Sequence, residues 1–437
     1  MEDYGNGLID NIVMPEKGEK SEIIKIIGVG GAGCNAVNNM VDMDIRGVNL
    51  VVCNTDIQAL DSSPVHRKIQ LGKMLTSGLG AGNNPARGRE SAIEAINDIE
   101  AILKDNTKMV FVTAGMGGGT GTGAAPVIAK CAKDMGLLTI GIVNIPYGCE
   151  GKPRIRQAIR GAMEMSQCVD SLLVVNTDRV LEMCGEKDLP LVETFNRCDR
   201  VMSDAARAIA EMIQKHNRVN IDFADVRTAM SDSGCALMGI AEASGDKRAE
   251  RATEEALNSP LLNNNKIDGA KYVLVNITTK TDDDLKTSEF KTITEIAYER
   301  AGGEDNELCQ VIYGAGSDET LEEGVIRVVV VATGFENDCF DSTLNKGPIC
   351  ISIDEENEEK SDEDAPPVVI DFGNPEDKET EKIIDVIYGG GKSAGGRRMT
   401  TSDLADPVCL PLDKLTEEEL ANIEQRPAYE RRRGGAK

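Results

Sequence analysis

The chain has 437 residues, of which 41% are apolar and 3% aromatic, and its formal net charge is −26. That length exceeds what one compact domain usually holds, and the negative charge opposes contact with nucleic acid or anionic lipid. The 12 cysteines include no C-x-x-C pair, so we expect neither a zinc site nor a disulfide framework, but a protein of the reducing cytoplasm. No apolar run approaches the ~20 residues that span a bilayer, so no direct membrane insertion is expected.

The first part of the chain alternates predicted strands and helices. Residues 1–22 are polar and are expected to form a flexible arm, and helical spacing then appears at 86–103 and 122–135. Between these patterns lie short apolar runs, nearly continuous and rich in β-branched residues, as in strands buried on both faces. These runs are 23–29, 48–53, 108–113, 137–143 and 171–175. The alternation predicts a Rossmann-like parallel α/β sheet over 23–188.

A long helical pattern separates this sheet from a second region. Apolar residues recur at three- and four-residue intervals through 189–216, which predicts a central helix, assigned to 189–219, that bridges two domains. A smaller α+β domain is expected over 220–335. Its predicted elements are a helix at 245–257 and strands near 271–278, 308–313 and 325–331.

The composition changes abruptly after residue 335. Residues 336–385 contain 17 acidic and 4 basic side chains, too few apolar groups to offset the entropy of ordering the chain. With the glycine-rich segment that follows, we expect a disordered linker over 336–405. A short tail, 406–437, ends in RPAYERRRGGAK, where the sign of the charge reverses.

Two glycine-rich loops follow predicted strands. In the first, Gly28-x-Gly30-x-x-Gly33 opens a helix, where free N–H groups attract a phosphate. This pattern alone also fits an NAD(P)-dependent oxidoreductase. The second loop, AGMGGGTGTG (114–123), favours a nucleoside polyphosphate held from two sides. A P-loop at Gly391-Lys392-Ser393 is rejected, because Val386 occupies its first glycine position.

The segment GGGTGTG (117–123) resembles the signature of the tubulin and FtsZ superfamily. Five further segments resemble that family's loops in chain order, so that the resemblance covers about 22–335, and a further short match lies at the C-terminus. They are GVGGAGCNAV (28–37), NTDIQAL (54–60), GLGAGNNPARG (78–88), EGKPR (150–154) and NIDFADVR (220–227).

The resemblance implies GTP and GDP as ligands, with Mg²⁺ held mainly through the phosphates and no metal-ligating side chains. The implied contacts with the α- and β-phosphates come from Gly31, Ala32, Gly33, Cys34, Asn35, Gly118, Gly119, Thr120 and Gly121. Those with the γ-phosphate, the ribose and the base come from Ala81, Gly82, Asn83, Glu150, Arg154 and Asp199. The catalytic loop would contribute Asn220, Asp222 and Asp225. Residues 176–179 depart from the family's pattern, so which of them contact the base stays open.

Asp199 suits guanine, because a carboxylate accepts from the N1–H and 2-amino groups that adenine lacks. Asp222 and Asp225 suit a water-positioning role, although Asp225 also fits the N-cap of a helix starting at Val226.

The resemblance further implies a GTP-dependent polymerising protein of the bacterial division ring, acting in the cytoplasm on the inner face of the membrane. Head-to-tail filaments would hydrolyse GTP where the next subunit completes the site. The implied partners are other copies of the chain and, through QRPAYERRR (425–433), membrane-anchoring division proteins such as FtsA.

Two alternatives remain, an NAD(P)-dependent oxidoreductase and a filament scaffold that does not hydrolyse GTP. The second glycine loop argues against the former, and the Asp222/Asp225 pair argues against the latter.

Overall fold

The computed structural model describes residues 22–335, except for 44, 46, 179, 181–190, 215–218, 220, 260–266, 268, 282, 304–305 and 307–308. The acidic linker and the tail predicted above lie outside the described residues, as does the N-terminal arm except for Glu22. Within the described part of the chain, no helix combines the length and apolarity needed to cross a bilayer.

Six parallel strands form the first part of the sheet, in the order β3-β2-β1-β4-β5-β6. Their buried, β-branched runs agree with the predicted strands, except that β3 was not foreseen because it is short and polar. The strands are β1 (Ile24–Val29), β2 (Val48–Asn54), β3 (Arg67–Gln70), β4 (Met109–Gly115), β5 (Leu138–Ile145) and β6 (Ser171–Asn176).

Four more strands continue the same sheet in the order β7-β10-β8-β9. β7 (Gly234–Ser244) pairs in parallel with β6, and β10 (Val325–Thr333) runs antiparallel to β7 and to β8 (Tyr272–Thr279). The last strand, β9 (Gln310–Ser317), is parallel to β8. β7 was not predicted, because small residues break its apolar run. α11 packs so closely on β7 that a Cβ at Gly239 would overlap the Ala256 carbonyl oxygen.

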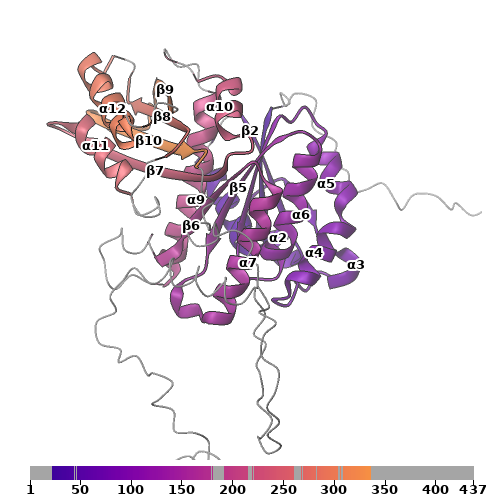
Figure 1. Cartoon of the computed structure of the whole chain (residues 1–437). Helices are drawn as coiled ribbons and strands as arrows, with labels where there is room; N and C mark the ends of the chain where they lie inside the picture. Colours follow the sequence, from indigo (N-terminus) through magenta and orange to yellow (C-terminus); the bar gives the residue numbers. More distant parts are fainter. Residues whose placement is uncertain are drawn as a thin grey trace, which may run out of the picture. The chain divides into compact units, whose positions relative to one another are not determined.

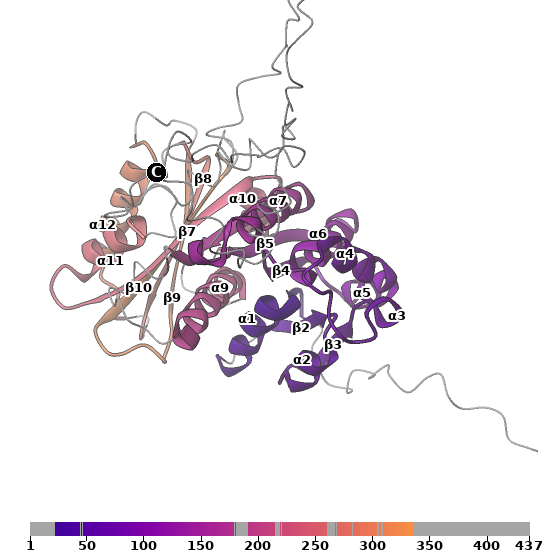
Figure 2. The same cartoon turned by 90° about the horizontal axis from the view of Figure 1, so that it is seen from below.

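Helices cover both faces of the sheet, and its two halves share one helical layer (Figures 1 and 2). The shared layer consists of α1 (Gly30–Asp42), α9 (Leu191–Gln214) and α10 (Phe223–Met230). The opposite face of the first half carries α4 (Pro85–Glu94), α5 (Ile96–Leu103), α6 (Thr120–Asp134) and α7 (Lys152–Cys168). The opposite face of the second half carries α11 (Arg248–Leu257) and α12 (Thr287–Arg300). Shorter helices are α2 (Ile57–Ser62), α3 (Lys73–Thr76) and the 3-10 turn η1 (Gly148–Glu150).

The predicted fold class is confirmed, with a parallel sheet, a long central helix and a smaller α+β region. The long helix predicted at 189–216 is α9, whose contacts with α1, β5 and β6 explain its apolar stripe. The helix predicted at 86–103 is two helices, because the chain departs from helical geometry at Ala95.

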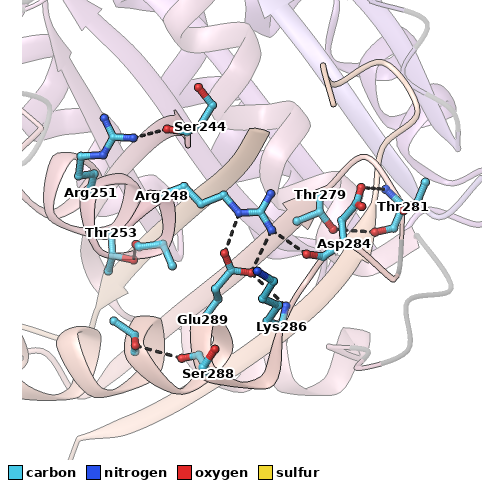
Figure 3. A network of polar contacts seen from close by, with 12 residues as sticks. Ser244, Arg248, Arg251, Thr253, Thr279, Thr281, Asp284, Lys286, Ser288 and Glu289 are labelled. Carbon is cyan, nitrogen blue, oxygen red and sulfur yellow. Dashed lines mark hydrogen bonds and ion pairs between the residues drawn. The ribbon is translucent and has the colours of Figure 1, made fainter. Parts of the chain in front are cut away.

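An arginine–glutamate pair joins the two helices on the outer face of the second half (Figure 3). Arg248 donates from Nε and Nη2 to the two carboxylate oxygens of Glu289, over 2.7 and 3.0 Å, and from Nη2 to the carbonyl of Asp284. The hydrogen bond from Arg248 lowers the pKa of Glu289. Such bidentate pairs are among the stronger polar contacts. The pair therefore fixes α11 against the start of α12, on the face of the sheet opposite α10.

Candidate functional site

The two glycine-rich loops meet at the carboxyl ends of β1 and β4. These strands are neighbours, so α1 and α6 begin side by side, and a Cβ at Gly30 would lie 2.8 Å from the Gly121 nitrogen. Neither helix has a capping side chain or an acidic residue in its first turn. The first N–H groups of a helix have no acceptor within the helix, and the amino end of its dipole is positive. The adjacent amino ends of α1 and α6 therefore form a site that suits an anion.

The first glycine loop packs tightly on the sheet. A Cβ at Gly33 would overlap the Thr113 carbonyl oxygen, so only glycine allows α1 to approach β4 this closely. Cys34 is buried, its sulfur lies 3.6 Å from the Cys53 carbonyl oxygen, and burial raises its pKa to about 12. The Cys34 side chain therefore belongs to the core, and only its backbone N–H can serve a ligand. Gly31 and Asn35 are exposed on the same turn.

The loop before α4 lies against the second glycine loop. A Cβ at Gly119 would be 2.7 Å from the Asn84 nitrogen and 2.9 Å from the Ala81 Cβ. Gly82 and Asn83 adopt left-handed backbone conformations, and Asn84 caps α4 through its side chain. The structure thus brings the predicted γ-phosphate residues next to the predicted α- and β-phosphate residues.

Two polar side chains that we did not predict as site residues hold the second glycine loop in place. Thr55 Oγ1 lies 2.7 Å from Thr120 Oγ1, and Gln157 Nε2 donates to the Gly117 and Gly118 carbonyls over 3.0 and 3.1 Å. Thr55 falls in NTDIQAL, so the family resemblance pointed to its segment. Gln157 lies within α7, where nothing in the sequence distinguishes it from a surface residue.

The predicted ribose residues also lie at the carboxyl ends of the parallel strands, just after β5. Glu150 forms an ion pair with Arg154 over 3.0 Å and accepts from the Tyr147 backbone over 2.8 Å. A Cβ at Gly117 would be 3.1 Å from Arg154 Cγ, which places this arginine beside the second glycine loop. Asp178 accepts from the Gly148 backbone over 3.2 Å, so one of the residues left open at 176–179 also borders this turn.

Asp199 is a buried carboxyl group on the α9 helix, which packs against α1. Its side chain is 6% exposed, and burial raises its pKa to about 7. The next turn of α9 is attached to α1, because Ser203 donates to the Ala36 carbonyl over 2.8 Å. The raised pKa of Asp199 is therefore a consequence of its burial, and burial also raises the pKa of Asp204 on the same helix.

The two predicted catalytic carboxylates begin α10. Asp222, and not Asp225, is the N-cap of α10: it has extended backbone geometry and accepts from the Asp225 nitrogen over 2.9 Å. Both carboxylates are exposed, whereas Ile221 is buried and packs beside Gly314 of β9. Asn220 lies outside the described residues. The loop is therefore anchored to the second half of the sheet, with its carboxylates directed to solvent.

The end of α10 lies at the amino ends of the parallel strands. The two glycine-rich loops, which we call the phosphate loops, lie at the opposite, carboxyl ends. α6 begins at the phosphate loops and ends beside Lys133, which pairs with Asp232 over 2.8 Å and with Asp170 over 3.3 Å. Asp170 immediately precedes β6, and Asp232 lies two residues beyond α10. A helix of 15 residues is about 22 Å long. In Figure 1, α10 lies near the top of the view, whereas α4, which packs against the second glycine loop, lies lower.

Family models match both halves of the sheet. The Tubulin/FtsZ family GTPase domain matches residues 23–185, and the FtsZ family C-terminal domain matches residues 234–336. The cell division protein FtsZ of Porphyromonas gingivalis is 41% identical over 421 residues, which cover 94% of this chain and 85% of that protein. The FtsZ of Buchnera aphidicola is 45% identical, with 73% and 81% covered.

Solved structures agree with this result. A structure described as an empty FtsZ dimer of M. jannaschii has a TM-score of 0.66 and 38% identity, covering 73% of this chain and 89% of its own. CetZ2 from Haloferax volcanii, at 22% identity and a TM-score of 0.61, supports the fold alone. Nothing in these comparisons favours the oxidoreductase alternative. The chain belongs to the Tubulin/FtsZ family and is a cell-division GTPase of the FtsZ type.

Proposed function

We propose that this GTPase completes its active site only where one subunit meets the next in a head-to-tail filament. The observation that carries the proposal is that the phosphate loops and α10 lie at opposite ends of the parallel strands. Helix α6 spans the distance between them, from Thr120 at the loops to Lys133 beside Asp232. One subunit cannot aim Asp222 at its own phosphates across that distance, whereas a stacked neighbour can. A contact of this head-to-tail kind does not close on itself and generates filaments.

In this mechanism the chain's own groups hold the nucleotide, and the neighbour's carboxylates position water. The N–H groups at the starts of α1 and α6 bind the α- and β-phosphates, and residues 81–83 bind the γ-phosphate. One Asp222 oxygen accepts from the Asp225 backbone, which fixes the side chain and leaves the other oxygen to accept from a water. Asp225 and Asn220 complete the water's environment, so that it is aligned with the γ-phosphate for in-line attack.

We place Mg²⁺ on the phosphate oxygens. The first turns of α1 and α6 carry no acidic residue, and no group of three or more metal-ligating side chains forms among the residues that the structure describes. The ion would offset the charge that builds up on the phosphates.

Dilution tests this proposal directly. Phosphate release per subunit should rise with protein concentration and vanish below a threshold, because a lone subunit lacks the water-positioning carboxylates. The measurement is the initial rate with saturating GTP over a wide range of protein concentrations. A constant specific activity on dilution would mean that the site is complete within one chain.

We further propose that Asp199 reads the guanine base as a carboxylate, which makes GTP binding depend on pH. With a pKa of about 7, most Asp199 side chains are ionised at pH 8 and most are protonated at pH 6. A protonated carboxyl cannot accept from both guanine donors, so affinity for GTP should fall by about tenfold between pH 8 and pH 6. Equilibrium binding to dilute protein measures this change.

ATP is the control for that experiment, because its γ-phosphate titrates as that of GTP does. Only the ratio of GTP to ATP affinity should change with pH, and Asp199→Ala should weaken the discrimination by about 1–3 kcal/mol. A GTP/ATP ratio that is the same at both pH values in the unmodified protein would remove Asp199 from base recognition.

We propose that the tail connects these filaments to membrane-anchoring division proteins such as FtsA, which would place the protein at the division site on the inner face of the membrane. The basis is the sequence of 425–433, where a proline, an aromatic residue and a basic cluster follow an acidic linker. Deleting 425–437 should leave GTP hydrolysis and filament formation intact but abolish recruitment to vesicles that carry such a partner. A truncated protein that no longer hydrolyses GTP would show that the tail contributes to the catalytic unit.

A further inference from the structure

Lys133, in the last turn of α6, contacts three separate acceptors. Its ammonium group donates to Asp232 Oδ1 over 2.8 Å and to the Val169 carbonyl over 2.9 Å, and it lies 3.3 Å from Asp170 Oδ1. The first turn of the same helix belongs to the phosphate site. One rigid element therefore carries nucleotide contacts at one end and this lysine cluster at the other.

Asp170 connects the amino ends of three strands. Its Oδ2 accepts from the Thr139 nitrogen of β5 over 2.8 Å, and its backbone carbonyl accepts from the Gly234 nitrogen of β7 over 3.1 Å. The carboxylate is only 11% exposed and immediately precedes β6. By binding Asp170, Lys133 is attached to the place where β5, β6 and β7 all begin.

Asp232 forms the connection between α10 and β7. Its backbone is left-handed, with φ at 46°, and the hydrogen bond from Lys133 lowers the pKa of its carboxyl. The far side of α10 is attached to β10, where Thr333 donates to the Ala229 carbonyl over 2.6 Å. The end of α10 is thus attached to both halves of the sheet, and on the nucleotide half Lys133 supplies a side-chain contact in addition to the backbone bond between Gly234 and Asp170.

We propose that Lys133 is a positioning residue for GTP hydrolysis, which sets α10 on the nucleotide half so that Asp222 and Asp225 meet the neighbouring subunit's nucleotide. This inference rests on the proposed completion of the site by the next subunit. Asp232 is 82% exposed, and an ion pair with such an exposed partner contributes little to global stability, whereas Asp170 is only 11% exposed and its contact with Lys133 also supports the fold. The consequence of losing the Asp232 contact is therefore mainly geometric, and a shift of about 1 Å in a reacting group is enough to slow a reaction by up to about 10²-fold.

Lys133→Met tests the proposal, because methionine keeps most of the aliphatic stem and removes the ammonium group. GTP binding to dilute protein should stay close to that of the unmodified protein, while kcat falls by about tenfold or more. The thermal unfolding midpoint should fall in this variant, because the nearly buried Asp170 loses its cation, but should stay normal in Asp232→Asn, which leaves that contact in place. Lys133→Arg should recover much of that loss. Asp232→Asn should lower kcat in the same direction, and the double variant should be little worse than either single one if both act through one contact.

Lys104→Met is the matched control. Lys104 also forms an ion pair near the end of a helix on the same face, with Glu100 over 2.9 Å, but it connects no two elements. Its removal should leave kcat unchanged. An unchanged kcat in Lys133→Met and Asp232→Asn, or an equal loss in the Lys104 variant, would overturn the inference.

Mixed filaments identify the side on which Lys133→Met fails. Asp222→Ala should bind GTP but lacks the Asp222 carboxylate, and Thr120→Arg should supply both carboxylates but accept no nucleotide. Lys133→Met should regain activity when mixed with Thr120→Arg and should gain nothing from Asp222→Ala. The opposite pattern would place its defect in the phosphate site and refute the positioning role.

The mixture of Asp222→Ala with Thr120→Arg serves as the reference. If this pair stays inactive in filaments that demonstrably contain both variants, the proposed sharing of the site between subunits is wrong. If the pair recovers but Lys133→Met does not follow the expected pattern, only the inference about Lys133 is wrong.

Discussion

Replacing Asp222 with alanine will lower GTP hydrolysis by about 10²-fold or more, the scale of positioned acid–base groups, and leave GTP binding by the isolated subunit unchanged. The Asp222 carboxylate belongs to α10, at the ends of the strands opposite the phosphate loops, so we expect it to touch no nucleotide bound by its own chain. The two measurements are phosphate release by assembled protein and equilibrium GTP binding below the assembly threshold. A parallel loss of both would mean that Asp222 supports the fold or its own pocket.

The N-cap role of Asp222 requires a matched variant. Its side chain accepts from the Asp225 nitrogen at the start of α10, and losing such a cap costs about 0.5–2 kcal/mol of stability. Asparagine caps a helix as well as aspartate does, so Asp222→Asn retains the cap and removes only the negative charge. We expect Asp222→Asn to be nearly as inactive as Asp222→Ala, with a normal unfolding midpoint. Near-normal hydrolysis in the asparagine variant would reduce Asp222 to a helix cap.

Mixing Asp222→Ala with Thr120→Arg extends this test. Each variant alone should be nearly inactive, and random mixing should make roughly one contact in four productive. Activity in the mixture should therefore return to a fraction of the unmodified rate, with both variants found in the pelleted filaments. Co-assembly without any recovery would contradict the shared site.

Gly88→Ala should also lower hydrolysis by up to about 10²-fold, although Gly88 was not predicted to touch the nucleotide. The residue lies in α4, where an added Cβ would overlap the Gly119 carbonyl oxygen and lie 3.1 Å from Thr120 Cα. The extra methyl must push α4 and the second glycine loop apart, which separates the γ-phosphate residues 81–83 from Gly119. Steady-state hydrolysis and GTP binding both report this displacement.

Glu90→Ala is the control for that variant, because Glu90 is exposed on the same helix and its removal disturbs no packing. It should behave as the unmodified protein does. Overpacking typically costs about 1–3 kcal/mol, so Gly88→Ala should also unfold at a lower temperature. Normal binding and hydrolysis in Gly88→Ala would show that the two loops need not be in contact during the reaction.

Several structural features followed from local sequence. The strands β1, β4 and β5 were predictable because their buried, β-branched runs match strands covered on both faces. The glycine loops at 28–33 and 114–123 were predictable because each follows such a strand and opens a helix. α9 was predictable from its length and spacing. These are properties of single segments, and short-range chemistry decides them.

Other features depend on segments far apart in the chain. β7 escaped prediction because its small residues reflect the closeness of α11, which no local pattern reveals. Asp222 rather than Asp225 caps α10 because packing of Ile221 beside β9 determines where that helix begins. The role of Gln157 could be recognised only from the tertiary structure, in which α7 lies beside Gly117 and the side chain donates to that loop.

The residue types that the proposed chemistry needs were therefore determined by the sequence, and their positions relative to one another were decided by the tertiary structure. The glycine loops, Asp199 and the Asp222/Asp225 pair were predicted, from their residue types and from the family resemblance, to bind a guanine nucleotide and to position water. The burial of Asp199, which raises its pKa to about 7, is a property of the packed structure alone. The placement of the glycine loops and the two carboxylates at opposite ends of the strands follows from the parallel sheet and from the length of α6, and it is the basis of the proposal that two subunits share one active site.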